Sequence, residues 1–317
     1  MQARGNALLV LSGPTASGKT ALGIELALRL NGEVVSADSM QLYRGMDIGT
    51  AKPELAERRG VPHHMLDVAE PSENYSAARY AAAASACVED IFSRGKVPVV
   101  VGGTGLYIDA LLQGTEYAAA PGDTGIREQL EREYDAQGGE EFRRRLAAVD
   151  PARAEKLAPA DKKRLVRAME VYLLTGETIT SHDEKSKNTP PRYTAFRLAL
   201  DFRERETLYR RIDLRAEQMF SAGLAREVQS LLNRGIPKNC TAMQAIGYKE
   251  VAGLLEGRIS EKEAVELVQR RSRQYAKRQL TWLRGKKDTR WLYWGEAPDL
   301  SAAADIIEQF RSFCAAG

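Results

Sequence analysis

The chain alternates short runs of apolar residues with longer segments in which apolar residues recur every three or four positions. The short runs predict buried strands, because a strand covered on both faces has no polar side, and the longer spacing predicts helices. Strands are expected at residues 7–11, 33–36, 98–101, 196–200 and 291–294. Helices are expected at residues 21–30, 76–93, 203–222, 224–234, 261–284 and 300–313. This order predicts an α/β fold, with a parallel sheet flanked by helices and right-handed crossovers.

The pattern changes between residues 120 and 192. Residues 118–123 (Ala-Ala-Ala-Pro-Gly-Asp) resemble a linker, and Pro190 and Pro191 close the section. Between them lie charged helical segments such as 127–134 and 162–174, and no strand is expected. We therefore predict a helical insertion domain over 120–192 in a core built from residues 1–119 and 193–317.

Composition places the chain among ordinary globular proteins. It has 317 residues, of which 44% are hydrophobic and 28% charged, and no apolar run approaches the roughly 18 residues of a membrane span. The cysteines Cys87, Cys240 and Cys314 are far apart and odd in number. This usage favours a reducing compartment over a zinc site. With no signal peptide visible before the first strand, we expect a cytoplasmic protein with no membrane partner; a monomer is the working expectation, with dimerisation left open.

A phosphate-binding motif, G-x-x-x-x-G-K-[ST], follows the first strand directly and opens the first helix. It consists of Gly13, Pro14, Thr15, Ala16, Ser17, Gly18, Lys19 and Thr20. Such a turn points backbone N–H groups at an anion. Lys19 adds a cation, and Thr20 offers a hydroxyl to Mg²⁺. The motif predicts a diphosphate or triphosphate ligand but does not specify the reaction.

Polar residues also follow the second and third strands, and ligands of open α/β sheets bind at the carboxyl ends of strands. Asp38 follows the second strand and could be a general base, a metal ligand or only a cap. Gly102, Gly103 and Thr104 follow the third strand, where a Mg²⁺-dependent NTPase often carries an acid. The missing acid argues against ordinary ATP hydrolysis, although a simple tight turn would look the same.

The adjacent histidines and the basic clusters are less specific evidence for a function. His63 and His64 are adjacent, so on a strand they would point to opposite faces and could not ligate one metal together; a structural role is favoured over one in orienting substrate. On the helix 261–284, a basic face with Tyr275 and Trp282 nearby would suit nucleic-acid phosphates and bases. The basic residues are Arg270, Arg273, Lys277 and Arg284. A second basic cluster spans residues 162–167. The net charge is only +3, so a nucleic-acid partner would need local basic patches of this kind. The competing interpretation of both clusters is a solvated charged surface.

Several motifs, taken in order, resemble those of the bacterial tRNA dimethylallyltransferases. Besides the phosphate loop they are Asp38–Gln41, Gly45–Pro53, Gly102–Thr104, Arg167–Val171, Gln244–Lys249 and Ala276–Arg284. The resemblance covers about residues 7–294. The phosphate loop is generic, whereas Asp-Ile-Gly-Thr-Ala-Lys-Pro together with Lys-Arg-Gln-Leu-Thr-Trp is highly specific.

The resemblance implies transfer of a dimethylallyl group from dimethylallyl diphosphate to N6 of the adenosine immediately 3′ of the anticodon in tRNA. The phosphate loop and the catalytic Lys19 would then hold the diphosphate leaving group, with Mg²⁺ on Thr20. Asp38 would accept the proton of N6, and Thr104 would contact the target nucleotide. From its position on the helix, Arg211 or Arg215 is a candidate to reach the diphosphate.

The resemblance also implies a set of tRNA contacts. These are Asp38, Ser39, Met40, Gln41, Thr104, Arg127, Lys163, Arg164, Leu165, Val166, Arg167, Gln244, Ala245, Ile246, Gly247, Tyr248, Lys249, Lys277, Arg278 and Arg284. Eukaryotic relatives often add a zinc finger at the C-terminus. The Cys/His pattern that such a finger needs is not seen here, which implies the bacterial form.

Three other functions compete with this interpretation. A small P-loop kinase would share the loop, the Mg²⁺ and a helical insertion. A dimethylallyltransferase acting on free AMP would keep the chemistry and need no basic surface. An RNA-binding protein without enzymatic activity would use the basic helix and leave the phosphate loop unexplained.

Overall fold

The computed structural model describes residues 7–113 and 125–316, so the predicted linker at 118–123 lies outside the described residues. The chain divides into two compact units. One contains Met1–Leu112 and Tyr193–Gly317, and the other contains Gln113–Arg192. The second unit occupies the stretch in which the sequence predicts an insertion.

The first unit is built on one sheet of six strands, all parallel, in the order β3-β2-β4-β1-β5-β6. The strands are β1 (Ala7–Ser12), β2 (Gly32–Ser36), β3 (His63–His64), β4 (Val97–Gly102), β5 (Thr194–Phe202) and β6 (Thr289–Trp294). The five strands expected from apolar runs are confirmed, as is the parallel sheet. The two-residue edge strand β3 contains the adjacent histidines.

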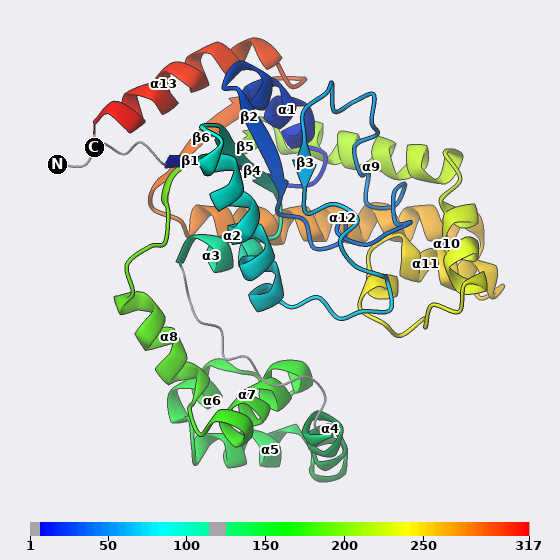
Figure 1. The fold of residues 1–317 in the computed structure, drawn as a ribbon. Coiled ribbons are helices and arrows are strands. Elements are labelled where there is room, and N and C mark those ends of the chain that lie inside the picture. Colours follow the sequence, from blue (N-terminus) through cyan, green and yellow to red (C-terminus); the bar gives the residue numbers. More distant parts are fainter. Residues whose placement is uncertain (1–6, 114–124, 317) are drawn as a thin grey trace. The chain divides into compact units, whose positions relative to one another are not determined.

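Helices cover both faces of this sheet (Figure 1). Leu9 and Leu11 of β1 pack with α1 (Lys19–Arg29) and α13 (Ala303–Ala315). Leu8 and Val10, the alternate residues, pack on the other face with α2 (Ala77–Ser93) and α3 (Gly105–Gln113). Since successive side chains of a strand point to opposite faces, a strand covered on both sides must be apolar throughout.

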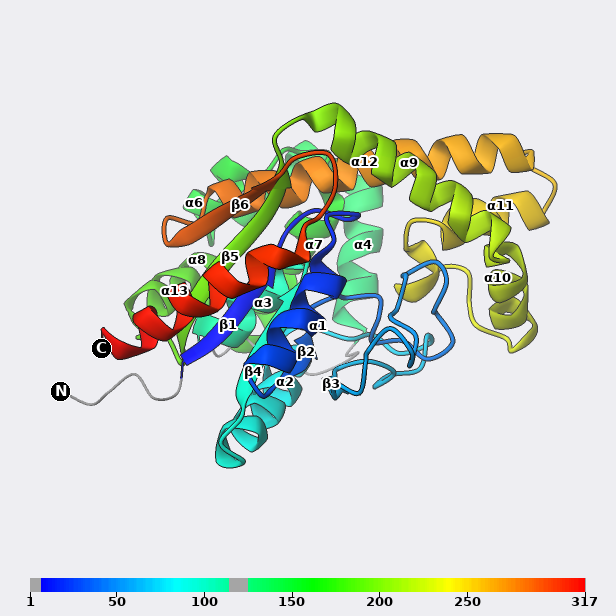
Figure 2. The same cartoon turned by 90° about the horizontal axis from the view of Figure 1, so that it is seen from above.

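The remaining helices of this unit are α9 (Arg205–Ser221), α10 (Leu224–Asn233), α11 (Tyr248–Leu255) and α12 (Glu261–Arg284). In Figure 2, α9 and α12 run side by side, and the two helices contact each other. A capping box starts α12, because the Ser260 hydroxyl accepts from the Glu263 N–H and the Glu263 carboxylate accepts from the Ser260 N–H. Near its other end, the ring of Trp282 lies against Gly105, which brings α12 to the turn after β4.

The described residues 125–192 of the second unit form helices joined by short turns, with no strand among them, as predicted. Its helices are α4 (Ile126–Gln137), α5 (Gly139–Ala147), α6 (Pro151–Lys156), α7 (Lys162–Thr175) and α8 (Ile179–Asn188). Phe142 and Leu146 form a small separate core with Leu165 and Val166 of α7. The apolar side chains of Leu165 and Val166 are buried and hold α7 in this unit, so any contact of these two residues with tRNA would have to use their backbone.

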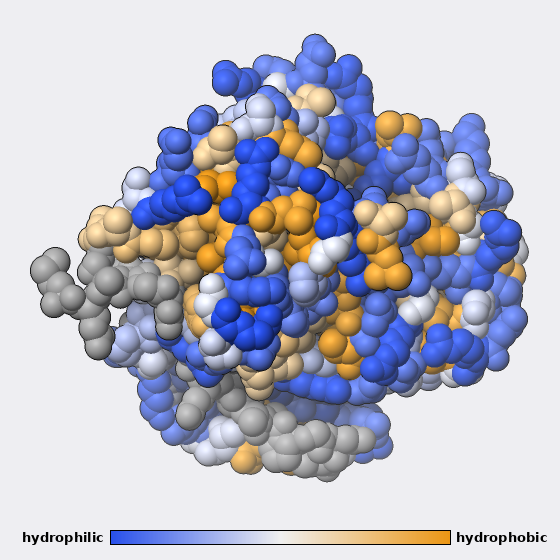
Figure 3. Space-filling view, turned by 45° about the horizontal axis from the view of Figure 1, so that its top comes forward, coloured by the Kyte–Doolittle hydropathy of each residue, from blue (hydrophilic) through white to orange (hydrophobic). Residues whose placement is uncertain are grey.

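Within the described residues, no helix combines the length and apolar character required to cross a membrane. On the face drawn in Figure 3, hydrophilic residues predominate and apolar residues appear as separate patches. This surface is typical of a chain whose apolar side chains are used in its internal cores.

Candidate active site

A cavity of about 300 Å³ opens beside the carboxyl ends of β2 and β4 in the first unit. Its wall combines the phosphate loop, the segment after β2, residues 49–53, α9, residues 244–246 and α12. A cavity therefore lies at the strand ends, where the sequence predicts that a ligand binds. Elements more than 250 residues apart in the chain contribute to the same cavity, so the complete site exists only in the folded molecule.

The phosphate loop leads directly into α1. Gly18 has a φ of 83°, in the left-handed region that favours glycine, and it ends the loop immediately before the helix. A Cβ on Gly18 would also lie 2.7 Å from Cγ of Pro298. No side chain caps the first turn of α1, so its N–H groups remain for an anion. Thr15, Lys19 and Thr20 line the cavity.

Three side chains from distant segments hold the backbone of this loop. Gln279 of α12 accepts from the N–H of Thr15 at 2.9 Å. Arg211 of α9 donates to the carbonyl of Ala16 at 3.1 Å, and the indole N–H of Trp294 donates to the carbonyl of Ser17 at 2.9 Å. Sequence reasoning missed Gln279 and Trp294 as supports of the loop, because a contact over 260 residues has no local signature.

Three cations line the cavity, Lys19 from the loop, Arg215 from α9 and Arg278 from α12. Burial, followed by repulsion from Arg215, lowers the pKa of Lys19 to about 8 against a partly compensating attraction from Asp38. Burial also lowers the pKa of Arg215, and the Asp38 carboxylate again opposes this effect. Lys19 and Arg215, two partly buried cations near one carboxylate, form a site suited to a further anion. Of the two candidate arginines, Arg215 lines the cavity and Arg211 binds the loop backbone.

Asp38 lines the same cavity and also caps a turn. Its Oδ1 accepts from the N–H of Met40 at 2.9 Å and from that of Gln41 at 3.4 Å. Both bonds fall on one carboxylate oxygen. The capping role and a role in chemistry are therefore compatible.

Thr104 does not line the cavity itself but is tied to the segment that does. Its hydroxyl oxygen accepts from the N–H of Ser39 at 3.0 Å and donates to the Ser39 hydroxyl at 3.3 Å. The turns after β2 and β4 are thereby joined, as expected for neighbouring strand ends of one sheet.

Tyr275 of α12 is a further cavity residue, named from sequence only as a nearby ring. Burial, and next the negative charge of Asp38, raise its pKa to about 12, so its hydroxyl remains a hydrogen-bond donor at neutral pH. The guanidinium of Arg278 lies 5.5 Å from the centre of its ring. An aromatic face and a cation at the rim of a cavity suit an extruded base and its phosphate.

The residues named as tRNA contacts lie in several environments. Those lining the cavity are Asp38, Ser39, Met40, Gln41, Gln244, Ala245, Ile246 and Arg278. Lys249 and Lys277 are exposed on α11 and α12. Arg284 is exposed and pairs with Asp201 at 3.4 Å. Tyr248 is buried and its hydroxyl donates to Glu227, and Gly247 is buried beside it, so the contact expected of these two residues stays a prediction that their burial does not favour.

In the second unit, Lys163 and Arg164 are exposed on α7. Arg127 and Arg167 share the carboxylate of Glu170, at 2.6 and 2.7 Å. That carboxylate is largely buried, and the two arginines hold its pKa below the usual range against the effect of burial. Both guanidiniums are thus fixed in position and remain partly exposed.

The two histidines face different groups. His63 lines the cavity and its Nδ1 lies 2.9 Å from the carbonyl of Val61. Burial lowers its pKa. His64 Nε2 lies 2.7 Å from the buried carboxylate of Glu33. Among residues 7–113 and 125–316, no three His, Cys, Asp or Glu side chains gather in a way that could hold a metal.

Comparison with known proteins gives one consistent family. The family model described as IPP transferase matches residues 41–286. The tRNA dimethylallyltransferase of Pelotomaculum thermopropionicum is 46% identical over 300 residues, which are 95% of each chain. That of Geobacter metallireducens is 48% identical over 285 residues, which are 90% of this chain and 92% of the relative.

Solved structures agree with the sequence comparison. The tRNA isopentenylpyrophosphate transferase of Bacillus halodurans superposes with a TM-score of 0.73 at 38% identity, covering 98% of this chain and 97% of that one. A eukaryotic dimethylallyltransferase described as acting on tRNA gives a TM-score of 0.82 at 30% identity, covering 97% of this chain and 79% of that one.

Proposed function

This chain belongs to the IPP transferase family, and from that premise we propose that it is a tRNA dimethylallyltransferase. It would move the dimethylallyl group of dimethylallyl diphosphate to N6 of the adenosine immediately 3′ of the anticodon, releasing diphosphate. The observation that carries the proposal is the placement of two partly buried cations, Lys19 and Arg215, in one cavity with the carboxylate of Asp38.

The cationic part of the cavity suits the leaving group. In the proposed step the bond between the allylic carbon and oxygen breaks, and its electron pair leaves with the diphosphate. Lys19, Arg215 and the free N–H groups at the start of α1 would stabilise that charge most as it develops. Because the loop is held by Gln279 and Trp294 before any ligand binds, little reorganisation is needed during the reaction.

The carboxylate of Asp38 suits the proposed acceptor of the dimethylallyl group, the N6 amine of adenine. The N6 amine shares its lone pair with the adenine ring, so it must lose a proton as the new carbon–nitrogen bond forms. Asp38 is the carboxylate available to take that proton, with Oδ1 already used as a cap. Thr104 and Ser39 would contact the nucleotide beside it, and Tyr275 offers a ring to the extruded base.

The donor set is compatible with Mg²⁺ bound mainly by the substrate. The cavity offers the hydroxyl of Thr20 and the carboxylate of Asp38, and Mg²⁺ commonly combines one or two protein ligands with phosphate oxygens and water. We propose that Thr20 holds the ion when it is bound, and the ion would then neutralise part of the diphosphate charge.

The partners in the proposal are tRNA and dimethylallyl diphosphate. Exposed Lys249 and Lys277 and the fixed guanidiniums of Arg127 and Arg167 supply positive charge for a phosphate backbone. We also propose a cytoplasmic monomer, which light scattering coupled to gel filtration would test.

Incubation with labelled dimethylallyl diphosphate tests the proposal directly. Label should enter unmodified tRNA and should not enter a matched tRNA that carries guanosine in place of the adenosine 3′ of the anticodon. Label entering AMP alone would instead indicate an enzyme for free nucleotide. Release of phosphate from ATP without label transfer would indicate a kinase.

A further inference from the structure

A glutamate outside every predicted motif holds one wall of the cavity. The wall is residues 47–53, referred to below as the 47–53 loop, of which Gly49, Thr50, Ala51 and Pro53 line the cavity. Glu227 of α10 accepts hydrogen bonds from three successive N–H groups of this loop. The distances are 2.9 Å from Asp47, 2.8 Å from Ile48 and 3.1 Å from Gly49.

The same carboxylate is fixed from a second side. The hydroxyl of Tyr248 on α11 donates to Oε1 of Glu227 at 2.5 Å. A Cβ on Gly49 would lie 2.4 Å from the Tyr248 ring, so the loop backbone rests directly on that ring. The amino end of the loop is thereby docked onto α10 and α11.

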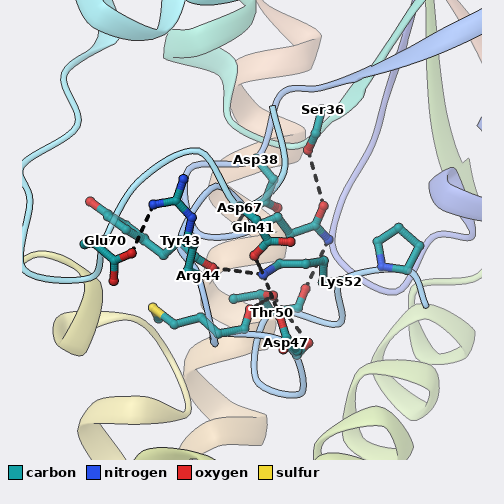
Figure 4. Close-up of polar contacts among 12 residues, drawn as sticks. Ser36, Asp38, Gln41, Tyr43, Arg44, Asp47, Thr50, Lys52, Asp67 and Glu70 are labelled. Atoms are coloured by element: carbon teal, nitrogen blue, oxygen red, sulfur yellow. Dashed lines mark hydrogen bonds and ion pairs between the residues drawn. The ribbon is translucent and has the colours of Figure 1, made fainter. Parts of the chain in front are cut away.

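Lys52 anchors the carboxyl end of the loop (Figure 4). Its ammonium group donates to the carbonyl of Tyr43 at 2.9 Å and to the carboxylates of Asp47 and Asp67 at 2.6 Å each. The side chain is 3% exposed. Because all three ammonium hydrogens are used, Lys52 stabilises the loop rather than offering a charge to a ligand.

The middle of the loop faces the reaction groups. The carbonyl of Thr50 accepts from the Arg215 guanidinium at 3.4 Å and from the Gln41 amide at 3.2 Å, and Gln41 also donates to the carbonyl of Ala51 at 3.2 Å. The position of the Thr50 carbonyl therefore orients Arg215 within the cavity. A shift of this loop would move the cation proposed for the diphosphate.

From this chain of contacts we infer that Glu227 is a positioning residue for prenyl transfer, acting on Arg215 through the 47–53 loop. The inference rests on the proposed function for its kinetic readout. Glu227 does not line the cavity itself and reaches it only through the residues of this loop. Its carboxylate accepts four hydrogen bonds, whereas a glutamine amide would present N–H groups to some of the same donors.

A double-mutant cycle of Glu227→Gln and Arg215→Gln tests this role. We expect Glu227→Gln alone to lower kcat/KM for dimethylallyl diphosphate by about tenfold, with the Kd for tRNA unchanged. In the Arg215→Gln background the same change should cost less than about twofold, since coupled residues are non-additive. Equal losses in both backgrounds, an unchanged kcat/KM, or a parallel loss of tRNA binding would each overturn the inference.

Two further variants provide a matched control and a second test of the inference. Glu263→Gln alters another glutamate that accepts a backbone N–H, at the start of α12, and should leave kcat/KM unchanged. Tyr248→Phe removes one of the four bonds to Glu227. It should show a smaller loss of the same kind, so the inference can be tested even if Glu227→Gln does not fold.

The affinity of each variant for inorganic diphosphate, measured by calorimetry, separates this inference from the proposed function. If wild type binds diphosphate and the cycle shows coupling in diphosphate affinity but no label reaches tRNA, the proposed function fails, while the positioning of Arg215 by Glu227 stands. If transfer occurs but coupling is absent from both binding and turnover, the positioning role fails alone. Absence of diphosphate binding in wild type would overturn both.

Discussion

The side-chain amide of Gln279 joins the phosphate-binding loop to the turn after β4. Its Oε1 accepts from the N–H of Thr15 at 2.9 Å, and its Nε2 donates to the carbonyl of Gly103 at 3.0 Å. Gln279 is 7% exposed, while its neighbours Lys277 and Arg278 are exposed on the same helix. One stretch of α12 therefore carries both a buried support for the diphosphate site and charges available to a nucleic acid.

Replacing Gln279 with alanine should loosen the phosphate loop. The loss of one or two hydrogen bonds, each worth about 0.5–1.5 kcal/mol, predicts a KM for dimethylallyl diphosphate raised by about 3- to 10-fold. The Kd for tRNA should stay the same. Steady-state kinetics and filter binding measure the two quantities. Gln269→Ala is the control on the same helix, because Gln269 contacts Glu217 and Asp213 instead; an equal rise in KM there would contradict the role of Gln279.

Asp38→Asn should reduce turnover while keeping the local fold. An asparagine oxygen can still accept from the Met40 N–H, so the change removes the basic oxygen and preserves the cap. General-base help is typically worth about 10²–10⁴-fold, and we expect a loss of kcat in that range. Single-turnover rates at saturating tRNA measure the effect. Near-normal rates would show that Asp38 is only a cap.

Diphosphate affinity should fall as pH rises through about 8. The pKa of Lys19 is lowered to about 8, so above that pH diphosphate binding must be accompanied by proton uptake, and the affinity drops by up to tenfold per pH unit. Calorimetry across pH 7–9.5 measures this slope. In Lys19→Arg the cation stays charged and the slope should be flatter; an identical slope would assign the titration to another group.

The lowered pKa of Lys19 also affects the stability of the unliganded protein, which should rise with pH where the affinity for diphosphate falls. The pKa of Lys19 falls from 10.5 to about 8 on folding, so between these values the unfolded chain binds more protons than the native one. The contribution of Lys19 to the free energy of unfolding therefore rises with pH across this window. Denaturant midpoints of wild type and Lys19→Met, compared at pH 7.5 and 10, should converge as the lysine loses its proton. A difference between the two midpoints that does not change with pH would contradict the titration of Lys19 as the cause.

Lys277→Gln should weaken tRNA binding in a salt-dependent way. If Lys277 contacts one phosphate, its removal should lower the slope of log K against log salt by a little under one unit. The control is Arg29→Gln on α1, a partly exposed arginine paired with Glu25. Arg284 is less suitable, because its removal would leave the buried Asp201 without that partner. An unchanged slope of log K against log salt in Lys277→Gln would indicate that this face of α12 is ordinary solvated surface.

The amino-acid sequence by itself determined the elements whose signal is local. The strand β4 appears as an apolar run because parallel strands are covered on both faces, and Gly13–Thr20 specifies its turn and its anion site through its own residues. The short strand β3 and helix α11 carried no comparable pattern. The motif resemblance named Asp38, which lines the cavity, and also Tyr248, Leu165 and Val166, whose side chains are buried, since a motif does not distinguish a surface position from a core position.

Only the tertiary structure decided how the cavity is held together. Gln279 meets Thr15, Trp294 meets Ser17 and Glu227 meets Asp47 across more than 170 residues. In each pair a side chain bonds a backbone N–H or carbonyl, a group that every residue type supplies, so the partner leaves no trace in the sequence. Such bonds form only once packing of the helices on the sheet has brought the segments within about 3 Å of each other.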